Sequence, residues 1–113
     1  MSEAKRPKVD AAAVAATRIV HSEPGVGAIA RHGPAGPHVL VRHLMGGVLA
    51  VHFAGDVHPG TGMPDFRMDR PHAILNVNAV DESPLWAAVE SDVPLAAAFS
   101  AAVAAVLDVP WPS

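Results

Sequence analysis

The segment that decides the fold is HVLVRHLMGGVLAVHFA, residues 38–54. Two runs rich in valine, leucine and other apolar residues, 38–45 and 48–54, flank the pair Gly46-Gly47. Two glycines between such runs are typical of a two-residue hairpin turn, because these turns need positive φ angles. The segment therefore predicts two antiparallel strands that reverse at Gly46-Gly47.

The position of the turn also predicts the register of the hairpin. If the two glycines form the loop, His43 faces Ala50 and Val41 faces His52. Side chains alternate between the two faces of a sheet, so His43 and His52 would be diagonal neighbours, about 7–8 Å apart. The opposite face would be the core face, with the residues Leu40, Leu44, Leu49, Val51 and Phe53.

The flanking sequence predicts the remaining elements. Further strands are expected at 25–31 and 72–80, and a helix at 11–20. Ser83-Pro84 is a typical helix start, and two helices are expected at 85–90 and 93–107. We predict an α+β fold, in which a small, mainly antiparallel four-stranded sheet carries an N-terminal helix and two C-terminal helices packed on one face. Residues 1–10 are expected to be a disordered tail, and 11–113 a single domain.

Composition excludes several classes of function. The chain has no cysteine, which excludes disulfides, thiolate metal sites and a cysteine nucleophile. Residues 11–113 hold five arginines and nine acids, a net charge of −4, which does not suit nucleic acid. The longest apolar helix, 93–107, would be about 22 Å long, too short to span a bilayer core of about 30 Å. The N-terminus lacks the apolar stretch of a secretory signal, so we expect a cytoplasmic protein without a membrane span.

Self-association is expected from the character of the core. Half of the residues are hydrophobic but only 4% are aromatic, so the core consists of many small side chains that each bury little area. The helix at 93–107 carries alanine on most of its surface. We therefore expect a homo-oligomer that assembles through this alanine-rich surface.

Six of the seven histidines lie between His32 and His72, around a long loop at 55–71. Imidazole acts as a metal ligand or a general base near neutral pH. The predicted register would let His43 and His52 share a divalent metal such as zinc, with Asp56 or His58 as a third ligand and one open position. The same group could instead hold a water for base catalysis. The plain alternative is that these histidines are surface residues without a chemical role.

Two functions follow from these patterns. The first is a small non-catalytic accessory module that binds a protein or a small molecule and self-associates. The alternative is a small metal- or histidine-dependent enzyme, with its site on the 38–54 hairpin and the 55–71 loop. A loop that closes over the histidines would favour the enzyme, and a loop that projects into solvent would favour the binding module.

Overall fold

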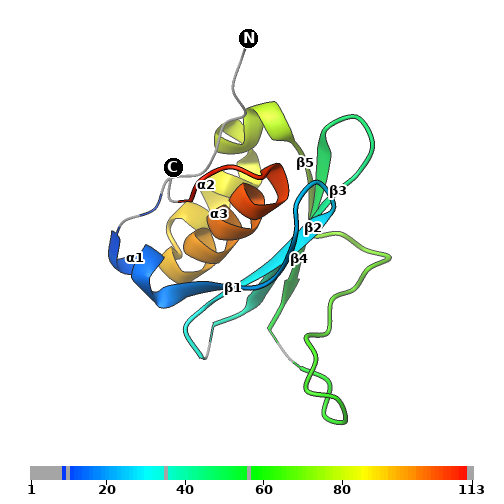
Figure 1. Ribbon diagram of the computed structural model, residues 1–113, viewed down its shortest axis with the longest axis vertical. Helices are drawn as coiled ribbons and strands as arrows, with labels where there is room; N and C mark the ends of the chain where they lie inside the picture. The colour runs from blue at the N-terminus through cyan, green and yellow to red at the C-terminus, as the bar shows by residue number, and fades with distance from the viewer. Residues whose placement is uncertain (1–8, 10, 35, 56, 112–113) are drawn as a thin grey trace.

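The centre of the molecule is a five-stranded antiparallel sheet in which each strand pairs with its neighbours in sequence (Figure 1). The computed structural model describes residues 9, 11–34, 36–55 and 57–111. The predicted α+β class and the antiparallel sheet are confirmed, but the sheet has one strand more than predicted. Its strands are β1 (Thr17–Glu23), β2 (Gly27–His32), β3 (His38–His43), β4 (Val48–Ala54) and β5 (Ala73–Asn76).

The additional strand, β1, occupies part of the segment predicted as a helix. The helix α1 is short, Ala11–Ala16, and the chain becomes extended at Thr17. At this junction, Oγ1 of Thr17 donates a hydrogen bond of 2.7 Å to the carbonyl oxygen of Ala13. The β-branched residues Thr17, Ile19 and Val20 favour strands over helices. The prediction of a helix through Val20 is therefore wrong.

The last strand is shorter than predicted, because an asparagine side chain ends it. Oδ1 of Asn76 accepts a hydrogen bond of 2.8 Å from the backbone N–H of Asn78. Such a local side-chain bond competes with strand pairing. The chain then forms the 3-10 helix η1 (Val77–Glu82) where the sequence predicted continued strand.

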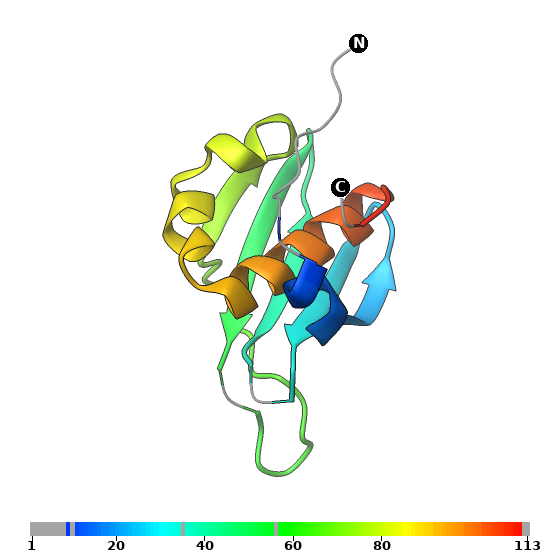
Figure 2. The same ribbon diagram turned by 90° about the vertical axis from the view of Figure 1, so that its left-hand side faces the viewer.

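Two capped helices follow, α2 (Pro84–Glu90) and α3 (Val93–Leu107). The hydroxyl of Ser83 accepts a bond of 3.0 Å from Leu85 N, which confirms the predicted helix start. Oδ1 of Asp92 accepts one of 3.1 Å from Leu95 N. Helix α3 lies across β1, β2 and β3, and both α1 and α2 contact it (Figures 1 and 2). Within the described residues, every helix falls short of the length and apolar character that a bilayer crossing requires.

Helix α3 is enclosed on nearly all sides within one chain. Every residue from Ala96 to Ala104 is buried, as is Val106. Nε1 of Trp111 donates a bond of 3.1 Å to the hydroxyl of Ser100, so the segment after the helix folds back onto it. The alanine-rich surface is thus covered by the chain's own elements, and it is not free for self-association.

The hairpin turns where the sequence predicted, but its register differs by one residue. The backbone N–H of Leu44 donates a bond of 2.7 Å to the carbonyl of Val48, and this encloses a three-residue loop, Met45-Gly46-Gly47. Both glycines have positive φ, 73° and 75°. As a result His43 pairs with Leu49 rather than with Ala50, and His52 pairs with Leu40 rather than with Val41.

This shift of one residue defines two faces that differ from the predicted ones. We call the face under α3 the helix face; it carries Ala28, Ala30, Val39, Val41, Leu49 and Val51, all fully buried. We call the other the loop face; it carries Arg18, Arg31, His38, Leu40, Arg42, Ala50 and His52. Leu40 was expected beside Leu49, but lies on the opposite side of the sheet from it.

Candidate ligand-binding face

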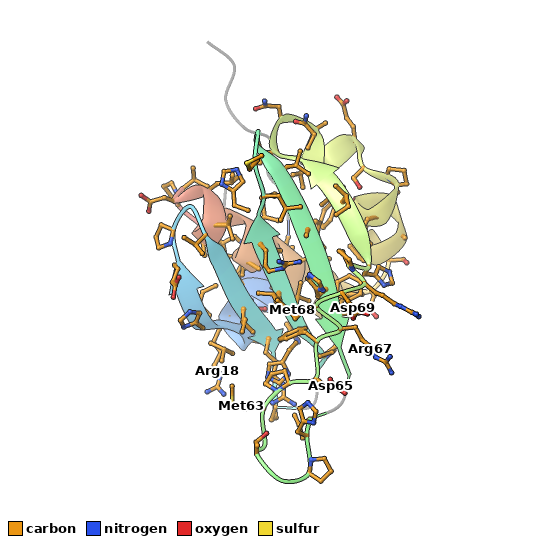
Figure 3. The ribbon with its side chains drawn as sticks, turned by 90° about the vertical axis from the view of Figure 1, so that its right-hand side faces the viewer. Arg18, Met63, Asp65, Arg67, Met68 and Asp69 are labelled. Carbon is orange, nitrogen blue, oxygen red and sulfur yellow. The ribbon has the colours of Figure 1, made fainter. Side chains whose placement is uncertain are left out.

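The loop that joins β4 to β5 lies on the loop face, on the opposite side of the sheet from the helices (Figures 1 and 3). Its outer part forms a small hairpin of its own, in which Val57 bridges to Pro64 and the His58 N–H donates a bond of 2.8 Å to Met63 O. The returning part runs back across the sheet, and His72 N bonds to Val51 O at 2.7 Å. One part of the loop therefore projects from the molecule and the other part covers the sheet.

His52 fixes the returning part of the loop to the sheet. Its side chain projects from β4 and is only 2% exposed. Nε of Arg42 is a donor and lies 3.1 Å from Nε2 of His52, so Nε2 accepts. The ring hydrogen is then on Nδ1, which donates across 3.1 Å to the carbonyl oxygen of Arg67 in the loop. His52 is thus a neutral imidazole with both nitrogens engaged.

The surroundings of His52 keep it neutral. Burial lowers the pKa of His52 below its usual value, and the guanidinium of Arg42 lowers it further, while the bond to Arg67 O opposes these effects. A protonated ring would present a hydrogen on Nε2 to a group that can only donate. The tie between sheet and loop therefore depends on the neutral ring.

The structure does not bring the predicted metal ligands together. His43 lies at the end of the sheet near the glycine loop, with Nδ1 3.2 Å from Gly25 O. His52 projects from the other face, and His58 lies in the outer loop, where Nε2 is 3.4 Å from Oδ1 of Asp65. Asp56 lies outside the described residues. Among the residues that are described, there is no group of three or more histidine, aspartate or glutamate side chains that could hold a metal ion.

The lone pair of His52 is already used within the fold. A base needs a free lone pair directed at a substrate, and in His52 that lone pair accepts from Arg42. His58 and Asp65 form a pair that is about half exposed, in the outer part of the loop. His72 stacks on Phe53, with ring centroids 4.5 Å apart. Each of these contacts has a structural role that is sufficient to explain the residue.

The loop face carries instead a row of basic side chains across three strands. Arg18 on β1 pairs directly with Arg31 on β2, and Arg31 pairs directly with His38 on β3. Arg18 lies at the end of the sheet from which the loop extends (Figure 3). The like charges of Arg18 and Arg31, directly opposite each other on neighbouring strands, are destabilising. We call these three residues the basic row.

Few of the arginines near this face are neutralised. Ion pairs among the described residues join His21 to Glu23, His58 to Asp65 and Arg70 to Asp69. Nε of Arg31 donates a bond of 2.8 Å to the carbonyl of Gly36, which fixes the side chain beside the turn at 33–37. In the described part of the chain, no carboxylate pairs with the arginines Arg18, Arg31, Arg42 and Arg67.

His38 completes the basic row from a buried position. It is 8% exposed and lies opposite Ala54 on β4. Burial lowers the pKa of His38, and the positive charges of Arg31 and Arg18 lower it further. Arg18 also lines a hollow of about 230 Å³ together with Ala16, Gly33 and Pro34. The row therefore ends beside a hollow that is open to solvent.

Sequence reasoning missed the basic row because the strand that carries Arg18 was predicted as a helix. Arg18 was placed on a helix, where it would have no relation to Arg31 or His38. The β-branched run at Thr17, Ile19 and Val20 could have indicated β1. The pairing of the strands across the turn at 33–37 would then have placed the three residues in one line.

Searches with family models, among curated proteins and among solved structures find no significant match to this chain.

Proposed function

We propose that this chain is a small non-catalytic binding module, and that its ligand-binding surface is the loop face. The observation that carries the proposal is the set of three arginines, Arg18, Arg31 and Arg42, on one sheet face without a carboxylate partner in the described part of the chain. Functional surfaces are commonly built from polar groups held on a rigid scaffold beside an adaptable loop. The sheet supplies the scaffold and residues 57–72 supply the loop.

Two further observations support binding rather than catalysis. The nitrogens of His52 are both engaged by neighbouring groups, so this buried imidazole holds the loop and has no lone pair for a substrate. The His58–Asp65 pair lies in the projecting part of the loop. The enzyme alternative required the loop to close over His43 and His52 together, and these side chains are on opposite faces.

Self-association remains part of the proposal, but it requires a surface other than α3. The alanines of α3 are buried within one chain. Sedimentation equilibrium over a wide concentration range measures the oligomeric state directly. A monomer at every concentration would remove this part of the proposal and leave the binding surface unaffected.

Nuclear magnetic resonance tests the binding surface. We expect that, in a panel of small anionic, neutral and cationic compounds, those that bind shift the amide signals of β1–β4 on the loop face and those of the loop. Proton spectra of the same mixtures, recorded over a day, should show no compound converted. Shifts confined to α2 and α3, no shifts with any compound, or turnover of a compound would each overturn the proposal.

A further inference from the structure

We propose that the basic row of Arg18, Arg31 and His38 binds an oxyanion, such as a phosphate or carboxylate group, next to the hollow that Arg18 lines with Ala16, Gly33 and Pro34. This inference rests on the proposed function and names its class of ligand. It concerns one end of the loop face, at the start of β1 and β3 and the end of β2.

The first argument is the cost of the arrangement without a ligand. Arg18 and Arg31 are direct cross-strand partners, and so are Arg31 and His38. The like charges of Arg18 and Arg31 oppose strand pairing, and no carboxylate of the described residues compensates them. An oxyanion between the guanidinium groups would convert this repulsion into charge-assisted hydrogen bonds.

The second argument is that one arginine is held in place while another is free to move. Nε of Arg31 donates a hydrogen bond of 2.8 Å to the carbonyl oxygen of Gly36, so the fold orders this side chain before any ligand binds. Arg18 is exposed on the edge strand, and its side chain makes no hydrogen bond or ion pair among the described residues. A fixed guanidinium next to a mobile one is suited to closing on a small anion, because guanidinium geometry matches the oxygens of phosphate and carboxylate.

The third argument is that space exists at the row. Arg18 lines a hollow of about 230 Å³ with Ala16, Gly33 and Pro34, and Arg31 and His38 follow Arg18 along the row. Gly33 has a φ of 68°, and its N–H bonds to Ala16 O, so the turn that forms this wall is fixed. Liquid water occupies about 30 Å³ per molecule, so the hollow has room for one oxyanion with several waters.

Because the chain has a negative net charge, anion binding would require a local cluster of positive side chains. Because residues 11–113 carry a net charge of −4, the long-range field does not attract anions. Anion binding at this row would depend on the local arrangement of the three side chains. Loss of a single arginine of the row should therefore have a larger effect than loss of an arginine elsewhere.

A titration with inorganic phosphate, pyrophosphate and citrate tests the inference. We expect saturable shifts of the amide signals of residues 31–38, and affinity that decreases as sodium chloride is added. Arg18→Gln should weaken binding by about tenfold or more, the effect of removing one charge-assisted hydrogen bond. The control is His21→Gln, which removes an exposed basic side chain that is paired with Glu23 at the far end of β1 and should leave affinity unchanged. A stronger response to phosphate than to citrate, or the reverse, identifies which oxyanion fits.

Two further readouts separate binding from a structural role. Arg18→Gln should leave the urea midpoint of unfolding unchanged or raise it, since the substitution removes repulsion; a lower midpoint would mean that Arg18 stabilises the fold and would overturn the inference. The His38 ring, flanked by Arg31 on β2 and facing Ala54 on β4, should titrate at higher pH when phosphate is saturating. Equal effects of Arg18→Gln and His21→Gln, or an unchanged His38 titration, would also overturn it.

These titrations distinguish failure of the oxyanion inference from failure of the proposed function. If neutral compounds shift the loop face while phosphate, pyrophosphate and citrate do not, the module stands and the oxyanion inference fails. If no compound shifts the loop face, both fail.

Discussion

Nε of Arg42 lies 3.1 Å from Nε2 of His52, and this contact fixes which ring nitrogen of the histidine carries the hydrogen. Because Arg42 can only donate, His52 donates through Nδ1 to the carbonyl of Arg67. One side chain on β3 thereby determines how β4 holds a loop that is remote in sequence. A structural histidine of this kind is easily mistaken for a catalytic one in the sequence.

Replacing His52 should loosen the loop. His52→Ala leaves Arg42 Nε and the Arg67 carbonyl without their partner, and a lost buried hydrogen-bond partner costs about 1–3 kcal/mol. We expect a corresponding decrease in the free energy of unfolding in urea, with faster amide hydrogen exchange in residues 66–72. His58→Ala is the matched control: its pair with Asp65 is half exposed, so its loss should cost less than about 1 kcal/mol. Equal costs for the two variants would contradict the role assigned to His52.

Stability should fall as the pH is lowered from 7.5 to 5. The pKa values of His38 and His52 are both lowered in the folded state, chiefly by burial. Above the usual histidine pKa of about 6.5 both states are neutral and their stability does not depend on these groups. Below it the unfolded chain takes up protons that the folded chain does not, so folding is disfavoured by up to about 1.4 kcal/mol per pH unit for each histidine.

Urea unfolding at closely spaced pH values measures this dependence. In the double variant His38→Gln/His52→Gln, the slope between pH 5 and 6.5 should be smaller than in the parent chain. A slope that is unchanged in the double variant would show that other groups cause it.

The observed register predicts that alanine substitution of two apolar residues on neighbouring strands changes stability by very different amounts. Leu49 is fully buried on the helix face, and Leu49→Ala should cost about 2–5 kcal/mol. Ile74 on β5 projects from the other face and is 56% exposed, so Ile74→Ala should change stability by about 0.5 kcal/mol or less. Thermal and urea unfolding of both variants checks this order. Comparable losses of stability in the two variants would contradict this register.

The N-cap of α3 offers a test of local helix stability. Oδ1 of Asp92 accepts the hydrogen bond of Leu95 N, and replacing such a cap by alanine costs about 1 kcal/mol. Asp92→Ala should lower the unfolding midpoint, while Asp92→Ser should retain most of the stability because serine also caps. If Asp92→Ser is as destabilising as Asp92→Ala, the carboxylate has another role, for example toward the nearby turn at 33–37.

The sequence predicted the structure correctly where a residue type strongly favours one backbone conformation or one local hydrogen bond. Gly46 and Gly47 predicted the turn correctly because both adopt positive φ. Ser83 predicted a helix start, and its hydroxyl caps α2. In each case the interaction that decides the structure is local, so neighbouring residues are sufficient to predict it.

The sequence was insufficient where the same residues fit two different local conformations. Two glycines fit a two-residue loop and a three-residue loop equally well, and here the loop includes Met45. Side chains alternate with a period of two, so this single additional residue moves His43 and His52 to opposite faces. The predicted metal pair depended entirely on that choice.

Alanine content misled in two different ways. The run at 11–16 is helical, but Thr17 and its neighbours form an edge strand, because tertiary pairing with β2 overrides a weak helix preference. The alanines of α3 indicated an intermolecular surface, but they allow close approach of elements of the same chain. Small side chains on a helix indicate close packing, and they do not say whether the partner belongs to the same molecule.

The main hydrophobic core contains no side chain from residues 57–72. Substitutions, insertions or deletions in this segment would therefore leave the interior of the protein intact, apart from the attachments of Arg67 to His52 and of His72 to Val51 and Phe53. Recognition could change over generations, or in a designed variant, at little cost to folding. The sheet and α3 form a platform on which loops of different sequence and length could be exchanged.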